Sequence, residues 1–234
     1  MIPTRCTIPT AASAPRRAAF IICAALLATS AGCHFSGQPI PKDWITTAAE
    51  AADVQDPPDT PTLQVIICYG TLTSNHGCLR LTFPDRNTLF WDPGGYIYEE
   101  PHYNRQHDVV RNNAPSLIDY WHLRRGEFGE PTMAAYEWTL SREDASLMYH
   151  VLYHGKAANL PDGKFDPDLP GLFCSIGVSR FLERYGEPYL DMPKGWWTPH
   201  GLAKHLLSQN PRRLIVFKRG KPTTISRPPP TPDS

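Results

Sequence analysis

Residues 63–92 decide the fold, because three apolar segments follow one another there with short polar connections. Leu63–Tyr69 (LQVIICY) is rich in β-branched residues and predicts a buried strand. His76–Phe83 (HGCLRLTF) alternates along the chain, and Thr88–Asp92 (TLFWD) forms a third apolar segment. Because Pro84–Asn87 has the composition of a turn, we expect these segments to form an antiparallel meander.

Three helices and one further strand are expected downstream. Ser141 has the side chain of a helix cap, and the helix after it would turn four apolar side chains inward: Leu147, Met148, Val151 and Leu152. A second helix is expected over about Cys174–Tyr185. A third begins at Thr198–Pro199, where the Thr198 hydroxyl is expected to cap the helix and proline takes the first helical position. Arg213–Lys218 predicts a last strand. Helices packed on an antiparallel sheet make the predicted fold class α+β.

The composition excludes several function classes. The 234 residues carry 23 basic and 23 acidic side chains, whereas nucleic-acid binders normally show a basic surplus, so no nucleic-acid partner is predicted. The sequence has no phosphate-binding loop and no dinucleotide fingerprint, and we predict no cofactor. His150 and His154 are four residues apart, but Val151 stands where a metalloprotease has glutamate, so no metal site is predicted.

Residues 1–32 have the features of a secretory signal peptide. Three arginines precede the apolar segment Ala18–Ala28, which is shorter than the roughly 20 residues that span a bilayer as a helix. The segment leads to Ser-Ala-Gly-Cys33, which resembles the lipobox of bacterial lipoproteins, although Ser30 replaces the usual aliphatic residue. The resemblance implies a diacylglycerol on Cys33, and hence a membrane lipid anchor that holds the protein in a bacterial cell envelope, facing the periplasm. Ordinary secretion with cleavage near Ala31 is the alternative.

Proline-rich segments are expected on both sides of one folded domain. After the lipidated Cys33, residues 33–62 are predicted to be a tether with one short helix at Trp44–Ala52. Residues 63–220 are predicted to form the domain. Residues 221–234, which end in PPPTPDS, are predicted to be a disordered tail.

Cys174 is the candidate nucleophile. It stands where a loop with two prolines and a glycine turns into a predicted helix. Unpaired backbone N–H groups and the positive end of the helix dipole stabilise a thiolate in a helix's first turn, and they could later hold an oxyanion. The alternative is a small buried apolar residue, which is a common role of cysteine.

His76 and Asp92 are the candidate partners of this thiol. His76 begins a strand, and a general base for a thiol must titrate near neutral pH. Asp92 ends the neighbouring strand and could fix the imidazole tautomer. A three-residue hairpin loop would put Asp92 on the His76 face of the sheet, whereas a four-residue loop would put it on the opposite face, so the sequence leaves the register open. Asp85 and Asn87 at the turn are the alternatives for the third residue.

The order His76, Asp92, Cys174 resembles the circularly permuted branch of the NlpC/P60 papain-like superfamily, which includes YiiX-like and lecithin retinol acyltransferase-like proteins. Three short segments carry the resemblance, namely the histidine strand, the element ahead of the nucleophile and the nucleophile segment itself: Asn75–Leu81, Gly163–Asp166 and Phe173–Ser175. The chain departs from the family at Ile176, where glutamate is frequent, and residues 96–139 match no known element.

The resemblance implies a permuted papain-like fold and a cysteine hydrolase that acts on an amide or ester bond. Cys174 would be the nucleophile, His76 the general base and Asp92 the residue that orients the imidazole. The envelope location makes a peptidoglycan stem peptide the expected substrate, and the acyltransferase-like relatives make a lipid ester its alternative. A non-catalytic binding or structural lipoprotein on the same fold, with Cys174 as a packed thiol, is the alternative function.

Cys68 and Cys78 lie on adjacent predicted strands. They could form a cross-strand disulfide if their Cα atoms are about 5.5 Å apart. Such a pair would leave Cys174 as the one thiol of the domain. The alternative is two unpaired strand residues.

Overall fold

The computed structural model describes residues 45–48, 59–69, 75–93, 103–105, 109–111, 114–128, 132–155, 174–195, 197–218 and 221–226. The predicted signal peptide, Cys33 and Gly163–Asp166 lie outside these residues. Within the described ranges, no helix has the length and apolar character that crossing a bilayer would require.

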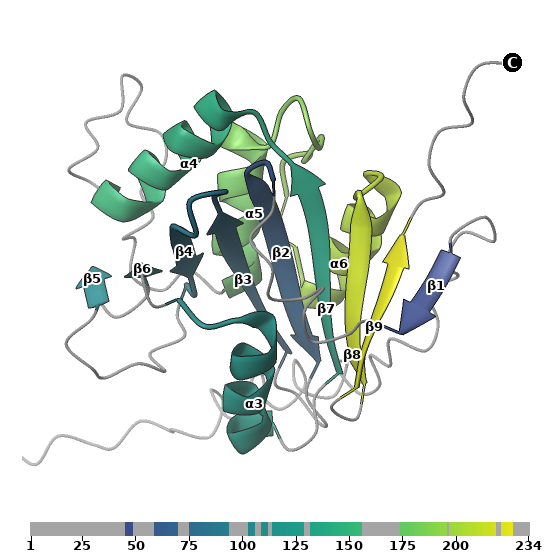
Figure 1. Cartoon of the computed structure of the whole chain (residues 1–234). Helices are drawn as coiled ribbons and strands as arrows, with labels where there is room; N and C mark the ends of the chain where they lie inside the picture. The colour runs from purple at the N-terminus through teal and green to yellow at the C-terminus, as the bar shows by residue number, and fades with distance from the viewer. Residues whose placement is uncertain are drawn as a thin grey trace, which may run out of the picture. The chain divides into compact units, whose positions relative to one another are not determined.

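An antiparallel sheet forms the centre of the described structure (Figure 1). Its strand order is β1-β9-β8-β7-β2-β3-β4-β6-β5. The described strands are β1 (Ile45–Ala48), β2 (Thr62–Tyr69), β3 (Asn75–Thr82), β4 (Thr88–Trp91), β5 (Tyr103–Arg105), β6 (Val109–Arg111), β7 (Thr132–Thr139), β8 (Arg213–Lys218) and β9 (Lys221–Ser226). The predicted meander is confirmed, because β2, β3 and β4 are neighbours in the sheet and pair antiparallel.

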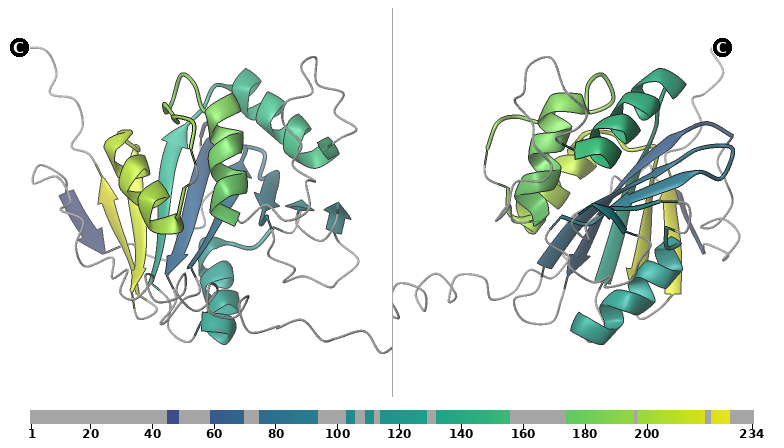
Figure 2. Two further views of the ribbon diagram at one scale, coloured as in Figure 1. Left: turned by 180° about the vertical axis from the view of Figure 1, so that it is seen from behind. Right: turned by 90° about the vertical axis from the view of Figure 1, so that its left-hand side faces the viewer.

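Helices cover both faces of this sheet (Figure 2). The helices α4 (Arg142–His154), α5 (Cys174–Tyr185) and α6 (Pro199–Ser208) pack on the face that carries Leu79 and Leu81. The helix α3 (Leu117–Phe128) packs on the opposite face, against Cys78 and Phe90. The α+β class is therefore confirmed, and each face of the sheet has its own apolar core.

Side-chain caps fix where the helices start. The hydroxyls of Ser141 and Thr198 accept the backbone N–H groups of Asp144 and Gly201, so both predicted caps are confirmed. Ser116 and Asp119 form a further capping pair at the start of α3, where the Ser116 hydroxyl accepts the Asp119 N–H at 3.1 Å. One predicted core position on α4 is wrong: Leu147 is 47% exposed, and Ala145 faces the core in its place.

Two predicted domain boundaries are corrected by the strands at the edge of the sheet. Ile45–Ala48 is the strand β1, where a tether and a short helix were expected, and Lys221–Ser226 is the strand β9, where a disordered tail was expected. β1 pairs with β9, and β9 pairs with β8. β1 gains its hydrogen bonds from β9, which is distant in sequence, and β9 gains its hydrogen bonds from β1 and from the preceding β8, pairings that the composition of each segment does not reveal.

Candidate active site

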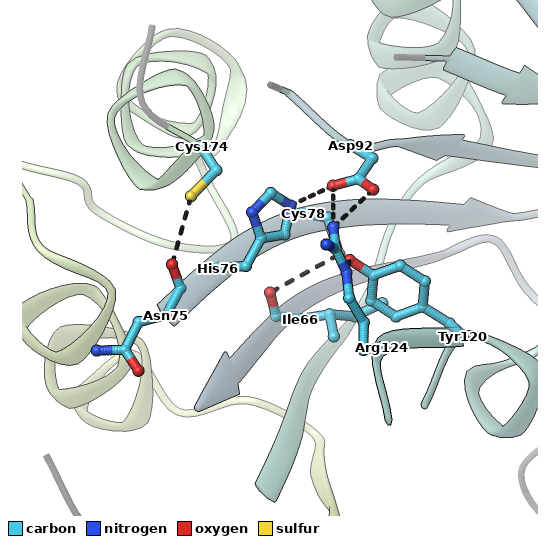
Figure 3. A network of polar contacts seen from close by, with 8 residues as sticks. All are labelled: Ile66, Asn75, His76, Cys78, Asp92, Tyr120, Arg124 and Cys174. Carbon is cyan, nitrogen blue, oxygen red and sulfur yellow. Dashed lines mark hydrogen bonds and ion pairs between the residues drawn. The ribbon is translucent and has the colours of Figure 1, made fainter. Parts of the chain in front are cut away.

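Cys174 is the first residue of α5 and is half-buried. Its thiol donates a hydrogen bond to the Asn75 carbonyl oxygen, with a sulfur–oxygen distance of 3.9 Å (Figure 3). The start of α5 lies close to β3 at Gly77, where a Cβ would be in van der Waals contact with the Ser175 Cα at 3.6 Å. The Ser175 hydroxyl donates to the Trp197 carbonyl at 2.7 Å and so anchors this end of the helix.

A second close approach brings α5 to the end of β4. A Cβ at Gly177 would lie 3.3 Å from the Cβ of Pro93, so glycine allows the helix to pack against this proline. Pro93 directly follows Asp92. The same packing therefore sets the start of α5 beside the end of β4, where the candidate carboxylate stands.

The imidazole of His76 lies between Cys174 and Asp92 (Figure 3). Its Nε2 forms a hydrogen bond with Asp92 Oδ1, and its other ring nitrogen, Nδ1, is on the side that faces the sulfur. Both His76 and Asp92 are buried. The structure thus brings together the three predicted residues from β3, from the position after β4 and from the start of α5.

The hairpin between β3 and β4, whose register the sequence left open, has a three-residue loop. β3 and β4 pair Leu79 with Trp91 and Thr82 with Thr88, so the loop is 84–86 and position 78 is opposite Asp92. His76 and Asp92 therefore lie on one face of the sheet. Asp85 and Asn87 stay at the turn, where the Asp85 carboxylate accepts the Asn87 N–H at 3.0 Å, and neither joins the site.

The electrostatics favour an ion pair between the histidine and the cysteine. Burial alone would lower the pKa of His76, but the charge and hydrogen bond of Asp92 raise it to about 9, with a further contribution from Cys174. Burial alone would raise the pKa of Cys174, but His76 and the backbone N–H groups of Gly77 and Ser175 lower it below its ordinary value. Both shifts favour the thiolate–imidazolium pair over the neutral pair.

Arg124 is a residue of this site that the sequence analysis did not identify. Its Nη2 donates to both oxygens of Asp92, at 3.0 Å and 2.8 Å, and its Nε donates to the Tyr120 hydroxyl at 2.8 Å. Tyr120 and Arg124 are four residues apart on α3, so they share one helical face. That spacing was the only available signal, and it lies in the stretch 96–139, which matched no known element.

Cys68 and Cys78 do not form the disulfide that was considered from their spacing. Both are buried thiols, and the register places Cys68 opposite His76 and Cys78 opposite Ile66. The two cysteines are therefore diagonal neighbours, whose Cα atoms are about 7–8 Å apart in an antiparallel pair. A disulfide needs Cα atoms within roughly 4.4–6.8 Å.

The described residues contain no group of three or more histidine, cysteine, aspartate or glutamate side chains arranged to hold a metal ion. His150 and His154 have ring centroids 4.6 Å apart on α4. The site combines a thiol whose pKa is lowered, an adjacent imidazole and a buried carboxylate, and this combination of groups is suited to acyl transfer.

No protein-family model, curated protein or solved structure matches this chain.

Proposed function

We propose that this chain is a cysteine hydrolase with a permuted papain-like domain of the NlpC/P60 type. The observation that carries the proposal is the position of the His76 ring between the Cys174 thiol and the Asp92 carboxylate (Figure 3). A packed cysteine needs neither a lowered pKa nor a histidine whose second nitrogen is held by a carboxylate. A nucleophile and its general base need both.

In the first half of the reaction, the Cys174 thiolate attacks the carbonyl carbon of an amide or ester and forms a C–S bond. The imidazolium of His76 gives its proton to the leaving nitrogen or oxygen as the C–N or C–O bond breaks, which leaves a thioester on Cys174. The oxyanion of the intermediate forms next to the first turn of α5. The backbone N–H groups of Gly77 and Ser175, which already lower the pKa of Cys174, would donate to it.

In the second half, neutral His76 takes a proton from water, and the hydroxide attacks the thioester carbonyl carbon. The C–S bond breaks, the acid product leaves, and the thiolate–imidazolium pair is restored. Asp92 keeps Nδ1 directed at the sulfur throughout, because its hydrogen bond holds Nε2.

The rate of Cys174 alkylation against pH tests this proposal. The measurement uses the chain from residue 33 with Cys33→Ser, treated with iodoacetamide, and compares it with its Cys174→Ser and His76→Ala variants. We expect rapid alkylation of Cys174 well below the ordinary cysteine pKa of about 8.5, and a marked slowing in His76→Ala. A Cys174 that reacts only after unfolding would contradict the proposal and favour the non-catalytic lipoprotein.

We also propose that the chain is a lipoprotein of the bacterial envelope, anchored through Cys33. This rests on the resemblance of residues 30–33 to a lipobox and on the signal-peptide pattern before them. Such a location gives the hydrolase either a peptidoglycan stem peptide or a lipid ester as substrate. Incorporation of a labelled fatty acid in a bacterial host, and its loss in Cys33→Ala, is the expected result. Equal labelling of both chains would contradict lipidation at Cys33.

A further inference from the structure

We infer that Arg124 is a positioning residue of the site, which fixes the Asp92 carboxylate against His76 and limits how strongly His76 holds its proton. This inference rests on the proposed function. It assigns a task to α3, which packs on the sheet face opposite α5 and contributes no residue to the bond-making steps.

The guanidinium of Arg124 is held at two separate points. Nη2 reaches both carboxylate oxygens of Asp92, and Nε donates to the Tyr120 hydroxyl at 2.8 Å. The Arg124 and Asp92 side chains are 2% and 1% exposed. Because Tyr120 fixes one side of the planar fork, the other side offers Asp92 a single orientation (Figure 3).

This orientation determines which oxygen meets the histidine. Asp92 Oδ2 accepts only from Arg124 among the described residues, whereas Oδ1 accepts from both Arg124 and His76. Without the guanidinium, the carboxylate at the end of β4 could rotate about its own bond, so that either oxygen would meet Nε2 in a less fixed geometry. Arg124 thus acts on the imidazole through Asp92.

Arg124 also changes the proton affinity of the imidazole. Burial disfavours its charge, but Asp92 raises the pKa of Arg124 further above its already high value, so it remains a cation. Cys174, His76, Asp92 and Arg124 then form a chain of alternating charge. Because the guanidinium and the imidazolium share Oδ1, the two positive charges oppose each other, and His76 releases its proton to a leaving group more readily.

A purely structural role for Arg124 would be to neutralise a buried carboxylate. Removing it would then lower the stability and leave the titration of His76 in the folded protein unchanged. Arg213 provides the matched control, since its Nε and Nη2 donate to the two oxygens of Glu137 at 2.7 Å and 3.0 Å. This pair lies on the same sheet and outside the site.

The experiment is an NMR titration of the His76 imidazole in the chain from residue 33 with Cys33→Ser, together with Cys174 alkylation. We expect Arg124→Met to raise the pKa of His76 by about one pH unit and to broaden the downfield Nε2–H proton signal. Millimolar guanidinium ion should partly restore the wild-type pKa of His76 and the sharp Nε2–H signal in this variant. Arg213→Met should lower the unfolding midpoint without moving the titration.

The outcomes separate this inference from the proposed function. A folded Arg124→Met with the wild-type titration would overturn the inference. If that variant does not fold, Arg124→Gln decides in the same way, because it removes the charge and keeps a polar side chain at this buried position. If the wild-type Cys174 is not activated by His76, the proposed function itself fails. If Cys174 is activated in the wild type but the pKa of His76 is unchanged in the Arg124 variants, only the inference about Arg124 fails.

Discussion

Asp92 and His76 lie on the same face of the sheet because the hairpin between their strands turns in three residues. Two backbone bonds close that turn: Arg86 N–H donates to the Phe83 carbonyl at 3.0 Å, and Phe83 N–H donates to the Asn87 carbonyl at 2.9 Å. Arg86 adopts φ 66°, in the left-handed region that three-residue hairpin loops require at their last position. One residue more in the loop would carry Asp92 to the face of Leu79.

Replacing Arg86 with glycine should stabilise the protein. A non-glycine residue in the left-handed region costs about 1–2 kcal/mol, which glycine would avoid. The greater flexibility of glycine in the unfolded chain offsets about 0.5–1 kcal/mol of this stabilisation. We expect Arg86→Gly to raise the free energy of unfolding by up to about 1 kcal/mol in urea denaturation. Asp85→Gly is the control and should lower it, because it loses the bond to the Asn87 N–H. Lower stability of Arg86→Gly would contradict this account of the turn.

Two substitutions at Gly77 should show whether the position of α5 controls the reactivity of Cys174. A Cβ there would meet Ile67 Cδ1 at 3.4 Å and Ser175 Cα at 3.6 Å, which is ordinary van der Waals contact. We therefore expect Gly77→Ala to keep most of the Cys174 alkylation rate. Gly77→Val adds two further carbons against the helix start and should lower that rate by about tenfold or more, as a shift of about 1 Å can. Equal rates in the two variants would show that the approach of α5 to β3 does not control the thiol.

Asp92→Asn should lower the pKa of His76 and raise that of Cys174. The charge and hydrogen bond of Asp92 are what raise the histidine pKa to about 9, so an uncharged amide removes most of that effect. The acid limb of the alkylation profile should move to higher pH. Stability should also fall by about 3–5 kcal/mol, since Arg124 would be left buried without its counter-ion. An alkylation profile identical to wild type would rule out Asp92 as the residue that supports His76.

The stability of the folded chain should decrease from neutral to alkaline pH through His76. Its pKa is about 9 in the folded state and 6.5 as its ordinary value. The folded state therefore binds this proton more tightly, and its contribution is fully present below pH 6.5 and is lost as the pH rises through about 9. The lowered pKa of Cys174 has the opposite effect on stability over this range, so the test uses the Cys174→Ser chain. Urea denaturation of that chain should show a decline of up to about 3 kcal/mol, with a smaller decline when His76→Gln is added. Parallel curves for the two chains would refute the linkage.

Thiol counting should distinguish the three cysteines of the folded domain. Cys68 and Cys78 are buried thiols, whereas Cys174 is half-buried at the start of α5. With Cys33→Ser in the chain from residue 33, Ellman's reagent should titrate one thiol in the native protein and three in denaturant without reductant. Detection of one thiol under both conditions would mean that Cys68 and Cys78 are joined after all.

The sequence was most informative where structure is determined locally. Ser141 and Thr198 mark helix starts by hydrogen bonds within four residues, and Cys174–Tyr185 shows its buried face in its own periodicity. The order of β2, β3 and β4 follows from short connections that leave adjacent strands few other ways to pair.

What the sequence could not supply depends on contacts between distant segments. β7 inserts between β2 and β8, and nothing in residues 132–139 indicates those neighbours. Arg124 contacts an aspartate 32 residues away, so its place at the site depends on how α3 packs rather than on any local pattern. The hairpin register was open because it depends on the backbone conformation of one residue, Arg86, whose type rarely adopts it.

The pairing of β1 with β9 limits how far the folded domain of the proposed enzyme can lie from its lipid anchor. β1 begins at Ile45, which is 45 − 33 = 12 residues after the proposed lipid attachment site. A fully extended chain spans about 3.5 Å per residue, so Ile45 can stand at most about 40 Å from the anchored cysteine. Had the chain first entered the sheet at Leu63, 30 residues after Cys33, the limit would have been about 100 Å. With the shorter limit of about 40 Å, the proposed enzyme would act on bonds in a thin layer next to the bilayer, and more distant substrates would have to diffuse to it.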